Sequence, residues 1–152
     1  MRNGNRILII DDDERICESL STVLKEEGYV VDVANNGKEA IALSYARFYN
    51  LAIVDWRLPD FEGTKLLGEL KETTPKMLKI MLTGYPSMSN AIDAVNNQAD
   101  SFLMKPVTME KLLEKIKELL QQQEEQNKFS EEKIANFIET KAKMLTNTQS
   151  KI

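Results

Sequence analysis

Short apolar runs that each stop at a polar residue recur along this chain, and they constrain its fold more than any other feature. The run at residues 7–10 stops at Asp11, and the run at residues 51–54 stops at Asp55. Two later runs stop at Thr83 and at Lys105. Apolar runs of this length are typical of strands that are buried on both faces of a parallel sheet.

Helical spacing fills the segments between these runs. Apolar residues recur three or four positions apart, and Gly28 and Pro75 mark the ends of two of the segments. Strands that alternate with helices predict an α/β fold, a doubly wound five-stranded parallel sheet with five helices. We expect the strands at residues 6–11, 29–33, 51–55, 78–82 and 101–104, a fourth helix around residues 91–95, and a last helix from about Thr108.

Ligands of such sheets bind at the carboxyl ends of the strands, so the polar residues found there are predicted to converge. Three carboxylates in one pocket repel one another, and a hard divalent cation such as Mg²⁺ relieves that cost. A lysine can neutralise one phosphate oxygen and a threonine can hydrogen-bond another. Because phosphoryl transfer needs mainly positioning and charge neutralisation, the set is sufficient for a carboxylate nucleophile. The converging residues are Asp11, Asp12, Asp55, Thr83 and Lys105.

Each of these residues also has a purely structural interpretation. An aspartate before a helix, as in residues 11–13, is a good N-cap. A single Thr-Gly or Lys-Pro pair says almost nothing by itself. Their joint occurrence at the ends of successive strands of one sheet favours the phosphoryl site.

Composition excludes several other classes of function. The 152 residues contain no histidine, which removes most zinc sites and any catalytic Ser-His or Cys-His pair. The net charge of -4 argues against a surface that neutralises nucleic-acid phosphates. The single cysteine, Cys17, and the lack of a long apolar segment lead us to expect a cytoplasmic chain without a membrane anchor.

Four segments carry a resemblance to response regulator receiver domains, and the match covers residues 6–121. The resemblance implies a flavodoxin-like receiver fold, Mg²⁺ as cofactor, and a signalling domain that catalyses only its own phosphorylation and dephosphorylation. The implied partners are a sensor histidine kinase or phosphotransfer protein and a downstream protein, with a homodimer possible. The segments read ILIIDDDE, LAIVDWRLPDFEG, IMLTGYP and SFLMKPV.

The resemblance also implies a role for each site residue. Asp55 is the expected phosphoacceptor, with Thr83 and Lys105 contacting the phosphoryl group. The expected metal ligands are Asp12 directly, Asp11 through water, Asp55, and the backbone carbonyl of Arg57.

Further roles concern the switch and the lifetime of the phosphate. Thr83 and Phe102 are the expected switch pair, although simple core packing would also explain Phe102. The bulky residues Arg57 and Tyr85 are expected to tune how long the acyl phosphate lasts. The peptide bond before Pro106 is expected to be cis.

Two other functions fit part of the pattern. A haloacid-dehalogenase-like phosphatase also uses aspartates, a lysine and magnesium, but it needs an acidic motif after the lysine, and no aspartate follows Asp100. A pseudo-receiver would act only as a binding module, yet such modules usually lose one of the site residues, and here all are present.

Residues 122–152 lie outside the receiver pattern, which we assign to residues 1–121. Ser130 has the features of a helix N-cap, with Phe129 and Ile134 spaced as a hydrophobic staple. We therefore expect a break after the preceding helix and a separate helix over residues 130–145. Its apolar stripe could dock on the receiver, on a second copy or on a partner, or the segment could be a linker to an output domain.

Overall fold

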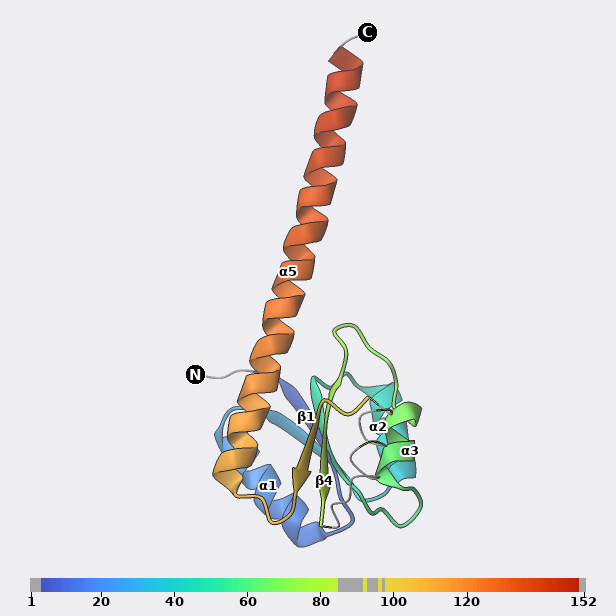
Figure 1. Cartoon of the computed structure of the whole chain (residues 1–152), viewed down its shortest axis with the longest axis vertical. Helices are drawn as coiled ribbons and strands as arrows, with labels where there is room; N and C mark the ends of the chain where they lie inside the picture. The colour runs from blue at the N-terminus through green and yellow to red at the C-terminus, as the bar shows by residue number, and fades with distance from the viewer. Residues whose placement is uncertain (1–3, 85–91, 93–95, 97, 151–152) are drawn as a thin grey trace. The chain divides into compact units, whose positions relative to one another are not determined.

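The computed structural model describes residues 4–84, 92, 96 and 98–150. From β1 (Arg6–Ile10) to β4 (Leu78–Thr83), strands and helices alternate as the sequence predicts (Figure 1). Helix labels follow Figure 1. The elements are β1 (Arg6–Ile10), α1 (Glu14–Glu26), β2 (Val30–Ala34), α2 (Gly37–Ala46), β3 (Leu51–Asp55), α3 (Gly63–Glu69), β4 (Leu78–Thr83), β5 (Ser101–Met104) and α5 (Met109–Ser150).

The five strands form one sheet in the order β2-β1-β3-β4-β5, and every neighbouring pair is parallel. The chain therefore moves outward in one direction from β1 to β2, then crosses back to β3 and continues to β5. This reversal beside β1 is the switch point at which doubly wound sheets bind their ligands. The predicted fold class is confirmed.

Two apolar layers cover the sheet because side chains on a strand alternate between its faces. Ile7 and Ile9 point into one layer, together with residues of α1 and the first turns of α5. Leu8 and Ile10 point into the other layer, together with residues of α2 and α3. All four side chains are essentially inaccessible to solvent, so β1 is anchored on both sides, and the residues that follow it are held in place.

The number of helices differs from the expectation in one respect. Four helices lie in the part of the chain that the structure describes, and most of residues 91–95, where a further helix was expected, lies outside it. None of the helices in the described ranges combines the length and the apolarity needed to cross a membrane.

The expected break before residue 130 is wrong. The backbone is helical without interruption from Met109 to Ser150. Ser130 is thus an interior helix residue rather than a cap. The intervening residues 121–128 are mostly Gln, Glu and Lys, which are good helix formers, and neither Pro nor Gly interrupts them. An i,i+4 ion pair between Lys128 and Glu124 at 3.3 Å adds a small local stabilisation.

By its internal contacts the chain divides into two units, Met1–Leu120 and Gln121–Ile152. The first unit contains the sheet and both apolar layers. The second unit, which we call the extension, is helical through its described residues.

Candidate phosphoacceptor and metal site

Three carboxylates meet at the carboxyl edge of the sheet. Asp11 and Asp12 directly follow β1, and Asp55 is the last residue of β3, the strand that pairs with β1. One carboxylate oxygen from each of the three lies within 4.8 Å of the other two. Asp11 and Asp55 are buried, whereas Asp12 is exposed. The structure thus brings together the three carboxylates that the sequence predicts.

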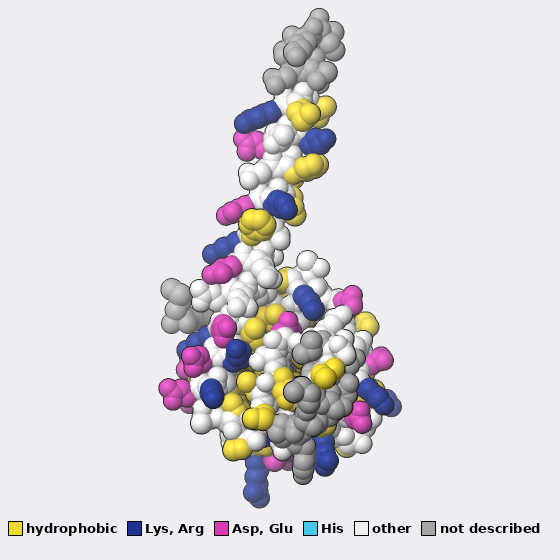
Figure 2. All heavy atoms as spheres, viewed as in Figure 1, with side chains coloured by type: hydrophobic (Ala, Val, Ile, Leu, Met, Phe, Trp, Pro, Cys, Tyr) yellow, Lys and Arg dark blue, Asp and Glu magenta, His cyan; other side chains and the backbone are white. Residues whose placement is uncertain are grey.

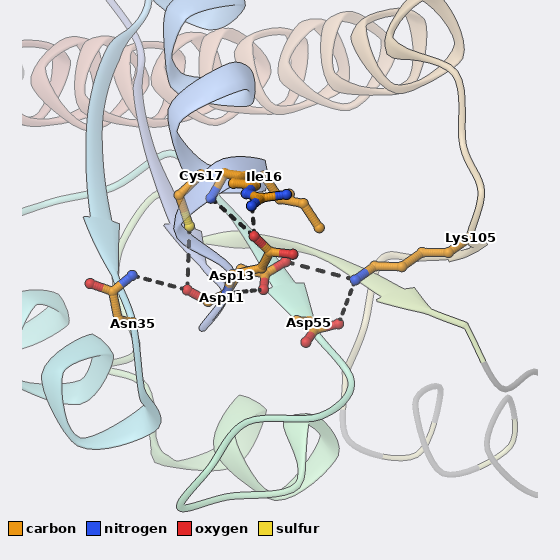
Figure 3. A network of polar contacts seen from close by, with 8 residues as sticks. Asp11, Asp13, Ile16, Cys17, Asn35, Asp55 and Lys105 are labelled. Carbon is orange, nitrogen blue, oxygen red and sulfur yellow. Dashed lines mark hydrogen bonds and ion pairs between the residues drawn. The ribbon is translucent and has the colours of Figure 1, made fainter.

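Lys105 reaches this cluster from the loop after β5. Its Nζ donates a hydrogen bond to Oδ1 of Asp55 at 2.9 Å and lies 3.7 Å from Oδ2 of Asp11 (Figure 3). The backbone N–H of Lys105 donates to the carbonyl of Thr83 at 2.7 Å, which fixes the start of the loop. The Lys105-Pro106 peptide bond is cis.

Burial and charge set the protonation behaviour of the pocket. Burial raises the pKa of Asp55 above its usual value, and the hydrogen bond from Lys105 only partly offsets it. Burial also raises the pKa of Asp11, with a further contribution from the Asp55 charge. Burial alone would lower the pKa of Lys105, but its hydrogen bond and ion pair with Asp55 outweigh this and raise it. The lysine is therefore held as a cation beside two carboxylates that are costly to ionise.

Bonds from three segments brace Asp11. Its Oδ1 accepts from the backbone N–H of Asp13 at 2.9 Å. Its carbonyl accepts from Cys17 Sγ at 3.3 Å and from Asn35 Nδ2 at 3.2 Å (Figure 3). Asp13 in turn caps α1 by accepting from the N–H groups of Arg15 and Ile16. The interpretation of this acidic run as a helix N-cap thus applies to Asp13, while Asp11 and Asp12 belong to the carboxylate cluster with Asp55.

Asn35 and Cys17 were not assigned to the site from the sequence. Asn35 is recognisable there only as a turn residue after a strand, and Cys17 only as an apolar helix residue. Their role is to hold the backbone of Asp11, and a backbone contact between distant segments leaves no pattern in a single sequence.

Gly63 is a further residue whose importance emerges only in three dimensions. A Cβ atom at this position would lie 2.7 Å from the carbonyl oxygen of Asp55 and 3.1 Å from the side chain of Met81. Its N–H donates to the carbonyl of Trp56 at 2.8 Å. The start of α3 therefore packs directly against the backbone of the expected phosphoacceptor, at a distance that only glycine allows.

The remaining predicted residues lie in the following places. Thr83 is fully buried at the end of β4. Phe102 is half-buried on β5 opposite Met81 and packs against the layer that contains α2 and α3. Arg57 is exposed in the loop after β3, where it forms an isolated bridge with Glu62. Tyr85 lies outside the described residues.

The donor set suits a hard divalent cation. One oxygen from each of the three carboxylates lies within 4.8 Å of the other two, and the pKa values of two of these carboxyl groups are raised. A cation of high charge density would relieve the repulsion among the carboxylates. Oxygen-only ligation without histidine or thiolate favours Mg²⁺ over zinc or copper.

Comparison with known proteins agrees with this fold. The family model for the response regulator receiver domain matches residues 7–117. The CheY-like response regulator receiver domain protein from Methanospirillum hungatei has 46% sequence identity and a TM-score of 0.78, covering 82% of this chain and 99% of that chain. A response regulator from Burkholderia pseudomallei, crystallised with a phosphorylated aspartic acid, a calcium ion and citrate, has 34% identity and a TM-score of 0.68, covering 72% of this chain and 65% of that one.

Curated relatives are longer regulators. The regulatory protein VanRB of Enterococcus faecalis is 35% identical over 115 residues, which is 76% of this chain and 52% of that protein. The transcriptional regulatory protein ZraR of Klebsiella oxytoca is 33% identical over 106 residues, which is 70% of this chain and 24% of that protein. The chain thus spans about half, or less, of the length of these relatives.

The fold and the family model together define a CheY-like receiver domain of two-component systems, a class of signalling domains that is distinct from classical enzymes. This chain belongs to the response regulator receiver domain family.

Proposed function

We propose that this receiver takes a phosphoryl group onto Asp55 from the phosphohistidine of a sensor kinase or phosphotransfer protein, in a reaction that requires Mg²⁺. The observation that carries the proposal is the position of Lys105, 2.9 Å from Asp55 and within ion-pair distance of Asp11. A cation at this position can form an ion pair with a phosphate oxygen once the carboxylate has become an acyl phosphate.

In the proposed reaction, a carboxylate oxygen of Asp55 attacks phosphorus. The new O–P bond forms as the N–P bond breaks, and the leaving imidazole keeps the electron pair. Asp11, Asp12, Asp55 and the carbonyl of Arg57 would hold Mg²⁺, which supplies charge neutralisation when it is bound. Lys105 would then pair with one phosphoryl oxygen, and the hydroxyl of Thr83 would donate to another.

An apolar groove beside the site supports a protein as the phosphodonor. It has a volume of about 580 Å³ and lies between α1 and the segment that joins β5 to α5. Lys105 is one of its lining residues, so the groove adjoins the phosphoacceptor pocket. A small phosphodonor would not need contacts with such a surface, whereas a helix of a donor protein could bury apolar side chains in it. The other apolar lining residues are Ile16, Leu20, Leu82, Pro106, Val107, Met109 and Leu112.

The proposed switch couples Thr83 to β5. In the sheet, Thr83 is paired with Met104, and Phe102 is two residues earlier on the same strand. Movement of Thr83 toward the phosphoryl group would free space for Phe102 to rotate and would change the surface that a downstream protein reads. Inverting a population from mostly inactive to mostly active needs about 5.5 kcal/mol of differential stabilisation. Charge-assisted hydrogen bonds from Lys105 and Thr83 would supply a large part of that.

Arg57 and Tyr85 are proposed to tune the lifetime of the acyl phosphate. The exposed position of Arg57 in the loop directly after Asp55 supports its part in this proposal. Bulky side chains there would limit the approach of water to the phosphorus atom.

The test is phosphorylation of the full chain by acetyl phosphate and by a phosphohistidine donor, read by intact mass. We expect one added phosphoryl group that depends on Mg²⁺ and is lost in Asp55→Asn. Asp60→Asn is the matched control, because Asp60 is an exposed aspartate of the same loop and should leave the modification intact. Undiminished phosphorylation of Asp55→Asn would refute the proposal, and no phosphorylation of the unaltered chain would indicate a pseudo-receiver.

A further inference from the structure

The extension carries large apolar side chains that are open to solvent. Ile134, Phe137, Ile138 and Leu145 are each 60% to 66% exposed. At 3.6 residues per turn, about 100° per residue, these four lie within a stripe roughly 100° wide. Figure 2 shows hydrophobic side chains exposed along this part of the helix, with Lys and Glu side chains between them. We call these four residues the stripe.

The spacing of the stripe is that of a helix that pairs with another helix. With Ile134 at position a of a heptad, Phe137 falls at position d, and Asn127, Ser130 and Lys141 continue the same seam. Seam positions of the extension before Ile134 are therefore uncharged and polar, and after Phe137 the seam continues with Lys141 at position a and Met144 at position d. A single Asn or Lys at position a is a known means of fixing register and the number of strands, at a cost in stability.

We propose that the extension is a self-association surface and that its occupant is the same segment of a second copy of this chain, in a parallel, in-register pair. Charge permits this, because residues 121–152 contain five glutamates and five lysines and so carry no net charge that would drive two copies apart. Parallel, in-register pairing places Ile134 and Phe137, at positions a and d, against their own copies, while Ile138 and Leu145, at position e, flank the seam. Asn127 then meets an amide that offers both a donor and an acceptor.

The exposed area sets the strength of the pair. The four stripe side chains leave on the order of 450 Å² of apolar surface per copy, given typical areas of large side chains. Two copies would cover about twice that, below the roughly 1,200 Å² at which stable specific interfaces begin. We therefore expect a weak dimer with a dissociation constant in the micromolar range. The proposal does not depend on phosphorylation of Asp55.

Two aromatic residues of the extension provide a matched pair of variants. Phe129 and Phe137 are 64% and 62% exposed. Each has a lysine four residues later whose Nζ lies over its ring, Lys133 at 5.7 Å and Lys141 at 5.6 Å. They differ in that Phe137 lies in the seam, whereas Phe129 is roughly 130° around the helix from the centre of the stripe.

Sedimentation velocity of the unphosphorylated full chain, over a concentration series to about 100 times the expected dissociation constant, tests the proposal. Phe137→Ala should weaken self-association by roughly tenfold or more, whereas Phe129→Ala should leave it unchanged. Lys141→Leu should strengthen it, and Lys143→Leu, which adds the same apolar group on the opposite side of the helix, should not. A monomer at all concentrations, or equal effects of the two members of either pair, would overturn the proposal.

Orientation has its own test. Under mild oxidation Ser130→Cys should form a disulfide-linked dimer, because d-position residues of a parallel pair lie within disulfide reach of their own copies. Glu132→Cys, on the far side of the helix, should not. Native Cys17 is buried and should not contribute. Efficient cross-linking at Glu132→Cys, or none at Ser130→Cys in a chain that does dimerise, would refute the parallel register. Asp55→Asn should dimerise like the unaltered chain, so this result is independent of the phosphorylation test.

Discussion

Lys105→Met should affect metal binding and phosphorylation in opposite directions. Lys105 occupies the same carboxylates that a metal would use, because its Nζ lies 2.9 Å from Asp55 and 3.7 Å from Asp11. Without the lysine, two buried carboxylates face each other with no cation nearby. Mg²⁺ should then bind more tightly, since it no longer competes with a resident positive charge. Phosphorylation should slow, because the charge that stabilises the transferring group is lost.

The size of each effect follows from the geometry. The ion pair is part-buried, with side-chain exposures of 28% for Lys105 and 11% for Asp55. Hydrogen bonds to charged groups contribute about 1.5–3 kcal/mol, and partial exposure of the lysine puts this one near the lower end. We therefore expect metal-free Lys105→Met to lose about 1–2 kcal/mol of the free energy of unfolding at pH 7. Loss of one preorganised charge donor should slow phosphorylation by about 10²–10³-fold.

The measurements are urea unfolding without metal, calorimetric titration with Mg²⁺, and the rate of phosphorylation by acetyl phosphate. Lys117→Met is the matched control, because Lys117 pairs with Glu27 at 3.3 Å on the exposed surface, and such pairs contribute well under about 1 kcal/mol. Weaker Mg²⁺ binding in Lys105→Met, or phosphorylation at the normal rate, would refute the reasoning.

Two further predictions concern packing and pH. Gly63→Ala should destabilise the fold by about 1–3 kcal/mol in thermal or urea unfolding, because its Cβ would meet the Asp55 carbonyl. Gly68→Ala in the same helix meets no atom within 4 Å and should be neutral or stabilising. The pKa values of Asp11 and Asp55 are raised, so Mg²⁺ affinity should fall as the pH drops through these pKa values. Trp56 fluorescence can be used to measure that affinity at each pH. The metal-free fold should gain stability over the same window, because it then binds more protons than the unfolded chain; a loss of stability there would contradict the assigned shifts.

The sheet and its polar edge were predictable because their signals are local. Each apolar run is long enough to be recognised as a buried strand, and each ends at the residue that faces the pocket. Parallel pairing then places those ends together without further information, so Asp11, Asp55 and Lys105 converge as a consequence of topology. Their roles in phosphoryl transfer stay predictions that the proposed experiments address.

The break in the last helix was predicted from local signals that proved too weak. A Ser with an apolar residue before it and acids after it is a good helix start, yet nothing in the preceding residues stops the earlier helix. Capping contributes about 1 kcal/mol. Breaking a helix also gives up several backbone hydrogen bonds that good helix formers hold at little cost. Without Pro or Gly, continuity is favoured.

Contacts between distant segments were not predictable from the sequence. The bonds from Cys17 and Asn35 to the backbone of Asp11, and the close approach of Gly63 to Asp55, depend on where folded segments meet. They also show how the site is built: the pocket residues lie at strand ends, but their backbones are fixed by neighbours from α1, the β2–α2 turn and α3. A substitution at any of these positions should therefore change the site by moving backbone, with every carboxylate and the lysine still present.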